Sequence, residues 1–167
     1  MTVSRPEGPT VPDAPFEMMV MLEAMRRLIV TSERFRSRAA EHLGLALGEV
    51  IILSLIGYPD PLTPTELAVA LGRNASTITA AIDRLEAAAM IERQPHPRDR
   101  RKTILVVSAE GERALSWLRA FSVEAFEQHD SATLARMTDT FDAAAAAIKA
   151  QGRRLDAAPY RRAPGRA

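Results

Sequence analysis

Two short helices joined by a very short turn are the feature that most restricts the fold of this 167-residue chain. The first helix begins after Thr63, whose side chain can cap free N–H groups, and Glu66 completes a capping box. It ends at Gly72, because glycine adopts the left-handed conformation after a helix at no steric cost. Asn74 is a favourable N-cap for a second helix. The pattern therefore predicts two helices packed across a tight turn.

The second helix divides into an apolar face and a small polar face. At about 100° per residue, one face is apolar throughout and carries Ile78, Ala81, Ile82, Leu85 and Ala89. The opposite face is small near its N-terminus, with Ser76, Thr77 and Ala80, and it carries the long cation Arg84 further on. Such a face can lie close to the floor of a DNA major groove, where Arg84 would reach guanine or phosphate. An ordinary amphipathic surface helix fits the same pattern, so this helix alone does not decide its function.

A predicted β-hairpin with a basic tip follows the second helix. Residues 90–94 and 103–107 are rich in strand-forming residues, and they flank a predicted long turn at residues 95–102. The cations of this turn are Arg98, Arg100, Arg101 and Lys102. A hairpin tip is solvated by default, but arginines beside a groove-reading helix are also well placed for phosphates or the minor groove. We expect Asp99 to be an internal partner that orients Arg101 rather than a DNA contact.

Several short motifs between Leu62 and Gly111 keep one consistent order and spacing. Asp99-Arg100-Arg101 is followed, after five residues, by Val107-Ser108-Ala109-Glu110-Gly111. The shorter motifs are Thr65-Glu66-Leu67-Ala68, Ser76-Thr77-Ile78-Thr79, Asp83-Arg84-Leu85-Glu86 and Ile91-Glu92-Arg93. Together they resemble the pattern of the MarR family of winged helix-turn-helix transcriptional regulators, including its Asp-x-Arg-x5-Leu-Thr-x-x-Gly signature. Each motif is weak alone, and their common spacing makes the resemblance specific.

The resemblance implies a mainly α fold with a small β-hairpin wing. A winged-helix lobe at about residues 46–108 would stand on dimerisation helices at about residues 16–40 and 109–151, all in one domain. It also implies an obligate homodimer that binds an inverted-repeat operator in double-stranded DNA, and many such proteins respond to small aromatic or anionic ligands. Carried over residue by residue, the DNA contacts are Ser76, Thr77, Thr79 and Arg84 on the helix and Arg98, Arg100 and Arg101 on the wing. Thr79 lies at the side of the exposed arc, so we rank it below Ser76 and Thr77.

The chain departs from the family pattern at the end of the second helix. The family usually has glycine there, in a Leu-Glu-x-x-Gly-Leu-Val pattern, whereas this chain has Ala89 before Met90 and Ile91. Alanine in the left-handed conformation costs about 1 kcal/mol relative to glycine, so either the strain is tolerated or the helix ends differently. Ala87 and Ala88 stand at positions that are often basic, which predicts fewer phosphate contacts there.

Apolar residues at helical spacing predict further helices on both sides of this unit. A long helix begins at Phe16 and carries a Met-rich stripe made of Met18, Leu22, Met25 and Ile29. The stripe predicts core or dimer interface, with a ligand-binding surface as the alternative. A short buried helix is expected at residues 47–56, followed by a rigid turn at residues 58–61. Leu62 is placed to pair with the wing.

Two more helices are expected after the hairpin. Ser108 caps the first, which runs to about Gln128, and the second runs from Ser131 to about Gln151. The second helix has an expected inward face made of Leu134, Met137, Phe141, Ala144, Ala145 and Ile148. With the helix that begins at Phe16, these helices are too apolar for the flank of a monomer, so we expect a homodimer.

The two ends of the chain have a different composition. Met1 to Pro15 holds regularly spaced prolines and few apolar residues, which predicts a disordered leader. Residues 152–167 are basic, and disorder is expected there, with an arm that binds the DNA flanks as the alternative.

The distribution of charge is more informative than the net charge of +1. Residues 72–102 hold seven Lys and Arg against four Asp and Glu, so the cation excess lies where DNA contact is expected. The absence of cysteine excludes disulfides, zinc–cysteine sites and thiol switches. No run of the sequence approaches the length of a membrane span, and the N-terminus lacks the apolar region of a signal peptide, so we expect a cytoplasmic protein.

Two other classes of function compete with a DNA-binding regulator. The three histidines His42, His96 and His129 have no metal-ligand spacing, and the chain has no recognisable nucleophile motif or Gly-rich phosphate loop. We therefore predict a protein that is not an enzyme, with no catalytic residue, metal or cofactor. A winged-helix module for protein contact without DNA binding is the second alternative, which the wing arginines disfavour. The preferred hypothesis is a ligand-responsive repressor.

Overall fold

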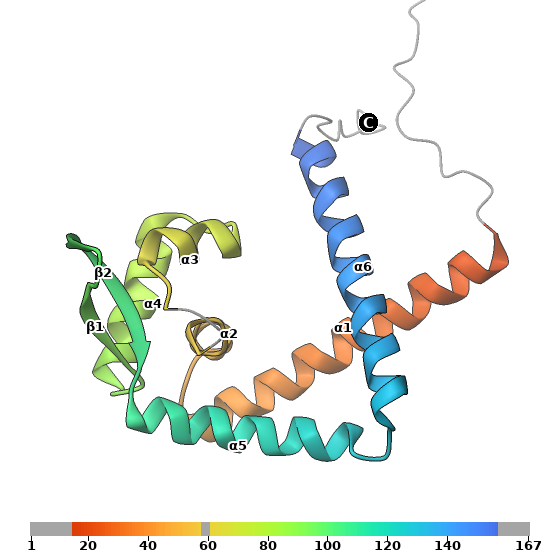
Figure 1. The fold of residues 1–167 in the computed structure, drawn as a ribbon, viewed down its shortest axis with the longest axis horizontal. Helices are drawn as coiled ribbons and strands as arrows, with labels where there is room; N and C mark the ends of the chain where they lie inside the picture. The colour runs from red at the N-terminus through yellow and green to blue at the C-terminus, as the bar shows by residue number, and fades with distance from the viewer. Residues whose placement is uncertain (1–14, 58–60, 157–167) are drawn as a thin grey trace, which may run out of the picture. The chain divides into compact units, whose positions relative to one another are not determined.

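The computed structural model of the chain describes residues 15–57 and 61–156, with the side chain of Arg100 excepted. In chain order the described elements are α1 (Phe16–Leu43), α2 (Leu47–Ile56), α3 (Pro64–Leu71), α4 (Ala75–Ala87), β1 (Ile91–His96), β2 (Asp99–Val107), α5 (Ala109–Phe126) and α6 (Ser131–Asp156) (Figure 1). The chain divides into two compact units, one up to Arg119 and one from Ala120 onward. The fold is mainly α with one two-stranded hairpin, which confirms the predicted fold class.

The α3–α4 pair forms through the capping groups that the sequence predicted. The Thr63 hydroxyl accepts a hydrogen bond from the Glu66 N–H at 3.2 Å, and the Glu66 carboxylate accepts one from the Thr63 N–H at 2.8 Å. Gly72 ends α3 in the left-handed conformation, with φ 58°. The Asn74 side chain then accepts from the N–H of Thr77 at 2.8 Å and starts α4. Both predicted helix boundaries at this turn are confirmed.

One face of α4 lies in the core of the first unit. Ile78, Ala81, Ile82 and Leu85 are all buried, as predicted, and they pack in one cluster with residues of α2, α3 and β2. Ala89 was expected on this face and is exposed instead. The expectation was wrong because α4 ends at Ala87, so the helical periodicity no longer applies to Ala89.

The hairpin has longer strands and a shorter turn than the sequence predicted. β1 pairs antiparallel with β2 from Ile91 opposite Val107 to Pro95 opposite Thr103, and only residues 97–98 separate the strands. The predicted turn at residues 95–102 is therefore wrong. Proline is tolerated in β1 because each strand of a two-stranded ribbon has one unpaired edge that needs no N–H.

Two further features of the first unit, a helix and a β-bridge, match their predictions. The helix expected at residues 47–56 is α2, with the same bounds. Leu62 pairs with the wing, since the Leu105 N–H donates to the Leu62 carbonyl oxygen at 2.8 Å. The turn expected at residues 58–61 lies mostly outside the described residues, as do most of the predicted leader and tail.

Ala89 connects α4 to the hairpin in a strained conformation. Its φ is 56°, and it is the non-glycine residue with positive φ in the described part of the chain. The Met90 N–H donates to the Leu85 carbonyl at 2.9 Å, a backbone bond typical of a left-handed helix end. The chain therefore tolerates the strain at Ala89, and α4 ends in the left-handed conformation that glycine would adopt there.

Ser108 fastens this connection to the start of α5. Its hydroxyl donates to the Ala89 carbonyl at 2.5 Å and accepts from the Gly111 N–H at 3.0 Å, which confirms its predicted role as a cap. Its own N–H donates to the Met90 carbonyl at 3.1 Å. A Cβ at position 111 would collide with that same carbonyl oxygen. The glycine of the signature is therefore required by the close approach of two backbones.

The stripe expected on α1 is exposed over most of the helix. α1 continues to Leu43, and its buried residues are Ala39 and Ala40, near its C-terminal end. There His42 makes an edge-on ring contact with Trp117 of α5, with the ring centroids 5.8 Å apart. In contrast, 47% of Met18 and 48% of Ile29 are exposed. The stripe is not part of the core of this chain.

The second unit contains the end of α5 and α6. The Asp130 carboxylate caps α6 by accepting from the Thr133 N–H at 2.7 Å, and the helix continues to Asp156, beyond the expected end near Gln151. The face that was expected to point inward contains no buried residue, and 53% of Ile148 is exposed. This face is therefore not part of a core in the single chain, and its place in a dimer interface stays a prediction.

The described residues also bear on membranes and metals. No single helix among them is long and apolar enough to cross a membrane. The pair α1 and α2, bent by 94° where they join, has the length and composition of a broken membrane span, and nothing else supports that assignment. The same residues contain no group of three His, Cys, Asp or Glu arranged to hold a metal ion.

The strain at Ala89 gives a testable prediction. Ala89→Gly should raise the free energy of unfolding by about 1 kcal/mol, because glycine adopts positive φ without a Cβ clash. Ala88→Gly is the matched control: position 88 has φ −80°, so glycine there should lower stability by about 0.5–1 kcal/mol. Denaturant unfolding at one fixed protein concentration measures both. Equal effects at the two positions would show that Ala89 is not strained.

Candidate nucleic-acid interface

The outward face of α4 is small and polar over its first two turns. Its exposed residues there are Ser76, Thr77, Thr79 and Ala80. The Ser76 hydroxyl donates to the Asn74 side chain at 2.9 Å, and the Thr79 hydroxyl donates to the Ala75 carbonyl at 2.9 Å. Both oxygens keep acceptor capacity, and either hydroxyl must rotate before it can donate to another group. The face therefore combines close approach with adaptable hydrogen bonding.

Thr77 and Thr79 lie on opposite flanks of α4. A hollow of about 480 Å³ between α3 and α4 is bordered by Thr79, Val69 and Arg73. A smaller hollow of about 180 Å³ between α2 and α4 is bordered by Thr77 and Arg84. Ser76 belongs to neither lining, and it stands between the two flanks. The predicted helix residues thus form one outward surface with two distinct sides.

Arg84 is exposed and forms an ion pair with a residue of another helix. Its Nε donates to the carboxylate of Glu49 on α2. The Arg84 side chain is 61% exposed, whereas the Glu49 side chain is 6% exposed. Sequence reasoning missed Glu49, although a single acidic residue within the otherwise apolar helix 47–56 was a usable signal.

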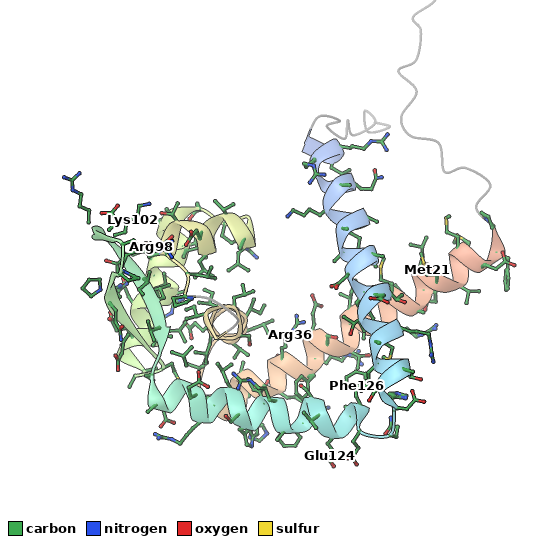
Figure 2. All side chains as sticks on the ribbon, in the orientation of Figure 1. Met21, Arg36, Arg98, Lys102, Glu124 and Phe126 are labelled. Atoms are coloured by element: carbon green, nitrogen blue, oxygen red, sulfur yellow. The ribbon has the colours of Figure 1, made fainter. Side chains whose placement is uncertain are left out.

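The basic residues of the hairpin lie where the strand register shifts. Pro95 pairs with Thr103, whereas the next residue, His96, pairs with Asp99. The intervening residues of β2, which have no partner opposite them in β1, are Arg100, Arg101 and Lys102. Arg98, Arg101 and Lys102 have exposed side chains, and Figure 2 shows Arg98 and Lys102 at the end of the hairpin. A bulge of this kind increases local twist and redirects side chains, so it separates the cations from the paired ribbon.

Asp99 shapes the hairpin end through the main chain. Its carboxylate accepts a hydrogen bond from the backbone N–H of Arg101 at 3.1 Å, rather than from the guanidinium as the sequence had suggested. The His96 ring nitrogen Nδ1 accepts similarly from the Arg98 N–H at 3.1 Å. The short acidic side chain forms a local turn, which is the more common role of aspartate at such positions. Asp99 thus orients the segment that carries Arg101, not the cation itself.

Arg93 joins the hairpin to α4. Its two terminal nitrogens donate to Asp83, at 2.5 Å, and to Glu86. The hydrogen bond to Asp83 raises the pKa of the Arg93 guanidinium above its ordinary value, against a smaller opposing effect of burial. The bridge holds β1 at one angle to α4, and it pairs two carboxylates that would otherwise stand unpaired beside the exposed cations.

The family assignment rests on the segment that forms this surface. The sequence profile of the MarR family matches residues 45–103, which extend from the approach to α2 into β2. The HTH-type transcriptional regulator PecS of Dickeya dadantii is 30% identical over 103 residues, which cover 60% of this chain and 62% of PecS. Residues 45–103 therefore form a MarR-family segment.

Solved structures show that the MarR-family fold extends over most of the chain. A MarR transcriptional regulator from Methanosarcina mazei Go1 is similar with a TM-score of 0.60 and 17% identity, over 82% of this chain and 99% of that one. A mutant of S. aureus MepR, solved bound to an oligodeoxyribonucleotide, has a TM-score of 0.52 and 17% identity, over 76% and 97%. At these identities the likeness concerns the fold. The chain spans 55–62% of the length of the curated relatives it matches.

Proposed function

We propose that this MarR-family protein is a sequence-specific transcriptional regulator that binds double-stranded DNA as a homodimer and is not an enzyme. α4 would enter the major groove, and the hairpin would act as the wing on the adjacent backbone or minor groove. The observation that carries the proposal is the joining of a small exposed α4 face to an exposed basic hairpin end. Arg93 and Ser108 hold the two at a fixed angle.

The proposed contacts follow from the length and charge of each side chain. Ser76, Thr77 and Thr79 are short, so they would bond base edges or phosphates where the helix lies close to the groove. Ala80 adds no polar group, and it suits apolar contact with a thymine methyl. The longer Arg84 is proposed to reach guanine or phosphate further along the groove. The proposed wing contacts are Arg98, Arg100 and Arg101, with Asp99 shaping the turn that carries them.

A homodimer is proposed because α1 exposes an apolar surface that a monomer would leave in water. The large apolar side chains of α1 that are at least 40% exposed are Phe16, Met18, Met19, Val20, Met21, Leu22, Leu28, Ile29 and Phe35. So many exposed large apolar side chains on one helix favour an interface rather than a surface left in water. Two-fold pairing of one chain with itself presents two copies of α4, which matches an inverted repeat in the DNA.

We further propose that the protein is a cytoplasmic repressor whose binding to its operator is weakened by a small aromatic or anionic ligand. A ligand that binds one arrangement of the two α4 copies better than another would shift the population toward that arrangement. DNA affinity and ligand affinity would then be coupled reciprocally. This part of the proposal rests on the family resemblance and on the apolar helices that flank the DNA-binding unit.

Selection from a random duplex library at near-physiological salt tests DNA binding without assuming an operator. We expect enrichment of two half-sites about 10 base pairs apart and related by a dyad, because a dimer places its reading helices in successive major grooves. Enrichment of no sequence would leave a winged-helix module for protein contact as the better description.

The selected site then allows a charge test of the wing. Arg98→Ala/Arg101→Ala should weaken binding at physiological salt by orders of magnitude and flatten the salt slope by about 2, because about one counterion is released for each phosphate contact. Arg34→Ala/Arg36→Ala on α1 is the matched control, which removes the same charge from exposed positions of another element. Equal slopes for the two double variants would remove the wing from the interface.

Substitutions on α1 test the proposed homodimer. Ile29→Glu, at a 48% exposed position, should shift the mass measured by light scattering from two chains toward one, because it places a charge inside an apolar interface. Thr31→Glu adds the same side chain to an exposed position about 200° further around the helix and should leave the mass unchanged. A wild-type protein that remains monomeric at micromolar concentration would contradict the proposed dimer.

Ligand response is tested with benzoate as a probe aromatic anion. We expect benzoate to raise the thermal midpoint of the free protein, because a ligand that binds the folded state stabilises it. We also expect it to weaken binding to the selected site, because the coupling between ligand affinity and DNA affinity is reciprocal. A neutral probe of similar size, benzyl alcohol, serves as the control for the anionic group. If a panel of such acids changes neither quantity, the protein is a constitutive regulator.

A further inference from the structure

We infer that Glu49 presets Arg84 as the reader of one guanine in each half-site, so that Glu49 is a positioning residue that acts through Arg84. The inference rests on the proposed function and deepens it, because it names the side chain that specifies a base pair. It also gives a role to Glu49, which lies on α2 and not on α4 or the hairpin, where DNA contacts are expected.

Glu49 has a fixed position that does not depend on Arg84. It stands in the first turn of α2, with 5% of the residue exposed. One carboxylate oxygen accepts from the backbone N–H of Ala46 at 2.8 Å and thereby caps α2, whose N-cap residue has no polar side chain of its own. The other oxygen accepts from the Nε of Arg84. The acceptor for Arg84 is therefore tied to the helix backbone.

The contact with Glu49 leaves the outer end of Arg84 available. A guanidinium has five N–H donors in one rigid plane, and the bond to Glu49 uses the one on Nε. The Arg84 side chain is 61% exposed even with this contact in place. Two parallel N–H groups at that end match the O6 and N7 acceptors of guanine in the major groove. Fixing the guanidinium before binding also reduces the rotamer freedom that would be lost in the complex.

The position of Arg84 along α4 complements the small residues before it. Thr77 and Arg84 are two helical turns apart, and both border the hollow between α2 and α4. The short side chains near the start of α4 allow the helix to approach the groove, and the longer Arg84 spans the larger gap beyond them. The neighbouring acids Asp83 and Glu86 are paired with Arg93 instead. Arg84 thus has an acidic partner of its own on α2.

A purely structural ion pair makes a different prediction. If the pair only fastened α4 to α2, loss of either partner would lower the affinity for every DNA sequence together with thermal stability. A preset reader instead changes the preference at one base pair. The sequence preference of variants distinguishes the two roles.

The experiment is selection from a random duplex library with the full chain as wild type, Arg84→Lys and Glu49→Gln. We expect the wild type to enrich one guanine per half-site that Arg84→Lys loses by roughly tenfold or more, because lysine lacks the two-pronged contact. Glu49→Gln should weaken the preference at that same base pair, while non-specific binding does not fall and the salt slope is unchanged, because Arg84 keeps its charge. Glu33→Gln, at an exposed position of α1, is the matched control and should select the wild-type site.

Each other result overturns the inference. Unchanged enrichment of the same base pairs by both variants, with lower affinity for all sequences, would make the pair structural and leave the proposed function intact. Enrichment of no sequence by the wild type would overturn the proposed function and this inference together. If Glu49→Gln does not fold, Arg84→Lys decides alone, because its ammonium can still pair with the buried carboxylate, and retained guanine preference would overturn the inference.

Discussion

The hydrogen bonds around Ser108 fix the geometry on which the candidate DNA surface depends. One hydroxyl bonds both to the carbonyl of Ala89, just after α4, and to the N–H of Gly111, in the first turn of α5. The hairpin begins and ends between these two points, so this hydroxyl, together with the Arg93 bridge to α4, fixes its direction. Ala89 holds a positive φ at this place, and the tight fit of Gly111 leaves no room for a Cβ. Local strain is thus retained where it orients the hairpin relative to α4.

Electrostatic pairing determines which charges the surface presents. Arg93 binds the two acids of α4, and Glu49 binds Arg84 from the neighbouring helix. The hairpin cations Arg101 and Lys102 are instead separated from the paired strands by the register shift. A chain with a net charge of only +1 can therefore present a locally basic edge.

Much of the first unit could be predicted because local signals specify it. The Thr63–Glu66 box, Gly72 and Asn74 each act within a few residues, so they set the same helix ends in any tertiary context. The buried face of α4 followed from periodicity. The hairpin turn was misjudged because Pro95 normally argues against a strand, whereas the isolated two-stranded ribbon supplies an unpaired edge that accepts it. The DNA contacts themselves stay predictions at every residue proposed.

The sequence by itself determined the order of the elements, their caps and the MarR-family character of the chain, since these depend on short-range patterns of residue types. Only the tertiary structure decided which side chains meet across elements. Glu49 and Arg84 are 35 positions apart, and no spacing rule connects them. Asp99 bonds to a backbone N–H rather than to a cation, and the apolar face of α6 that was expected to point inward is exposed in the single chain. These contacts depend on how separate elements pack, which local propensity and periodicity do not encode.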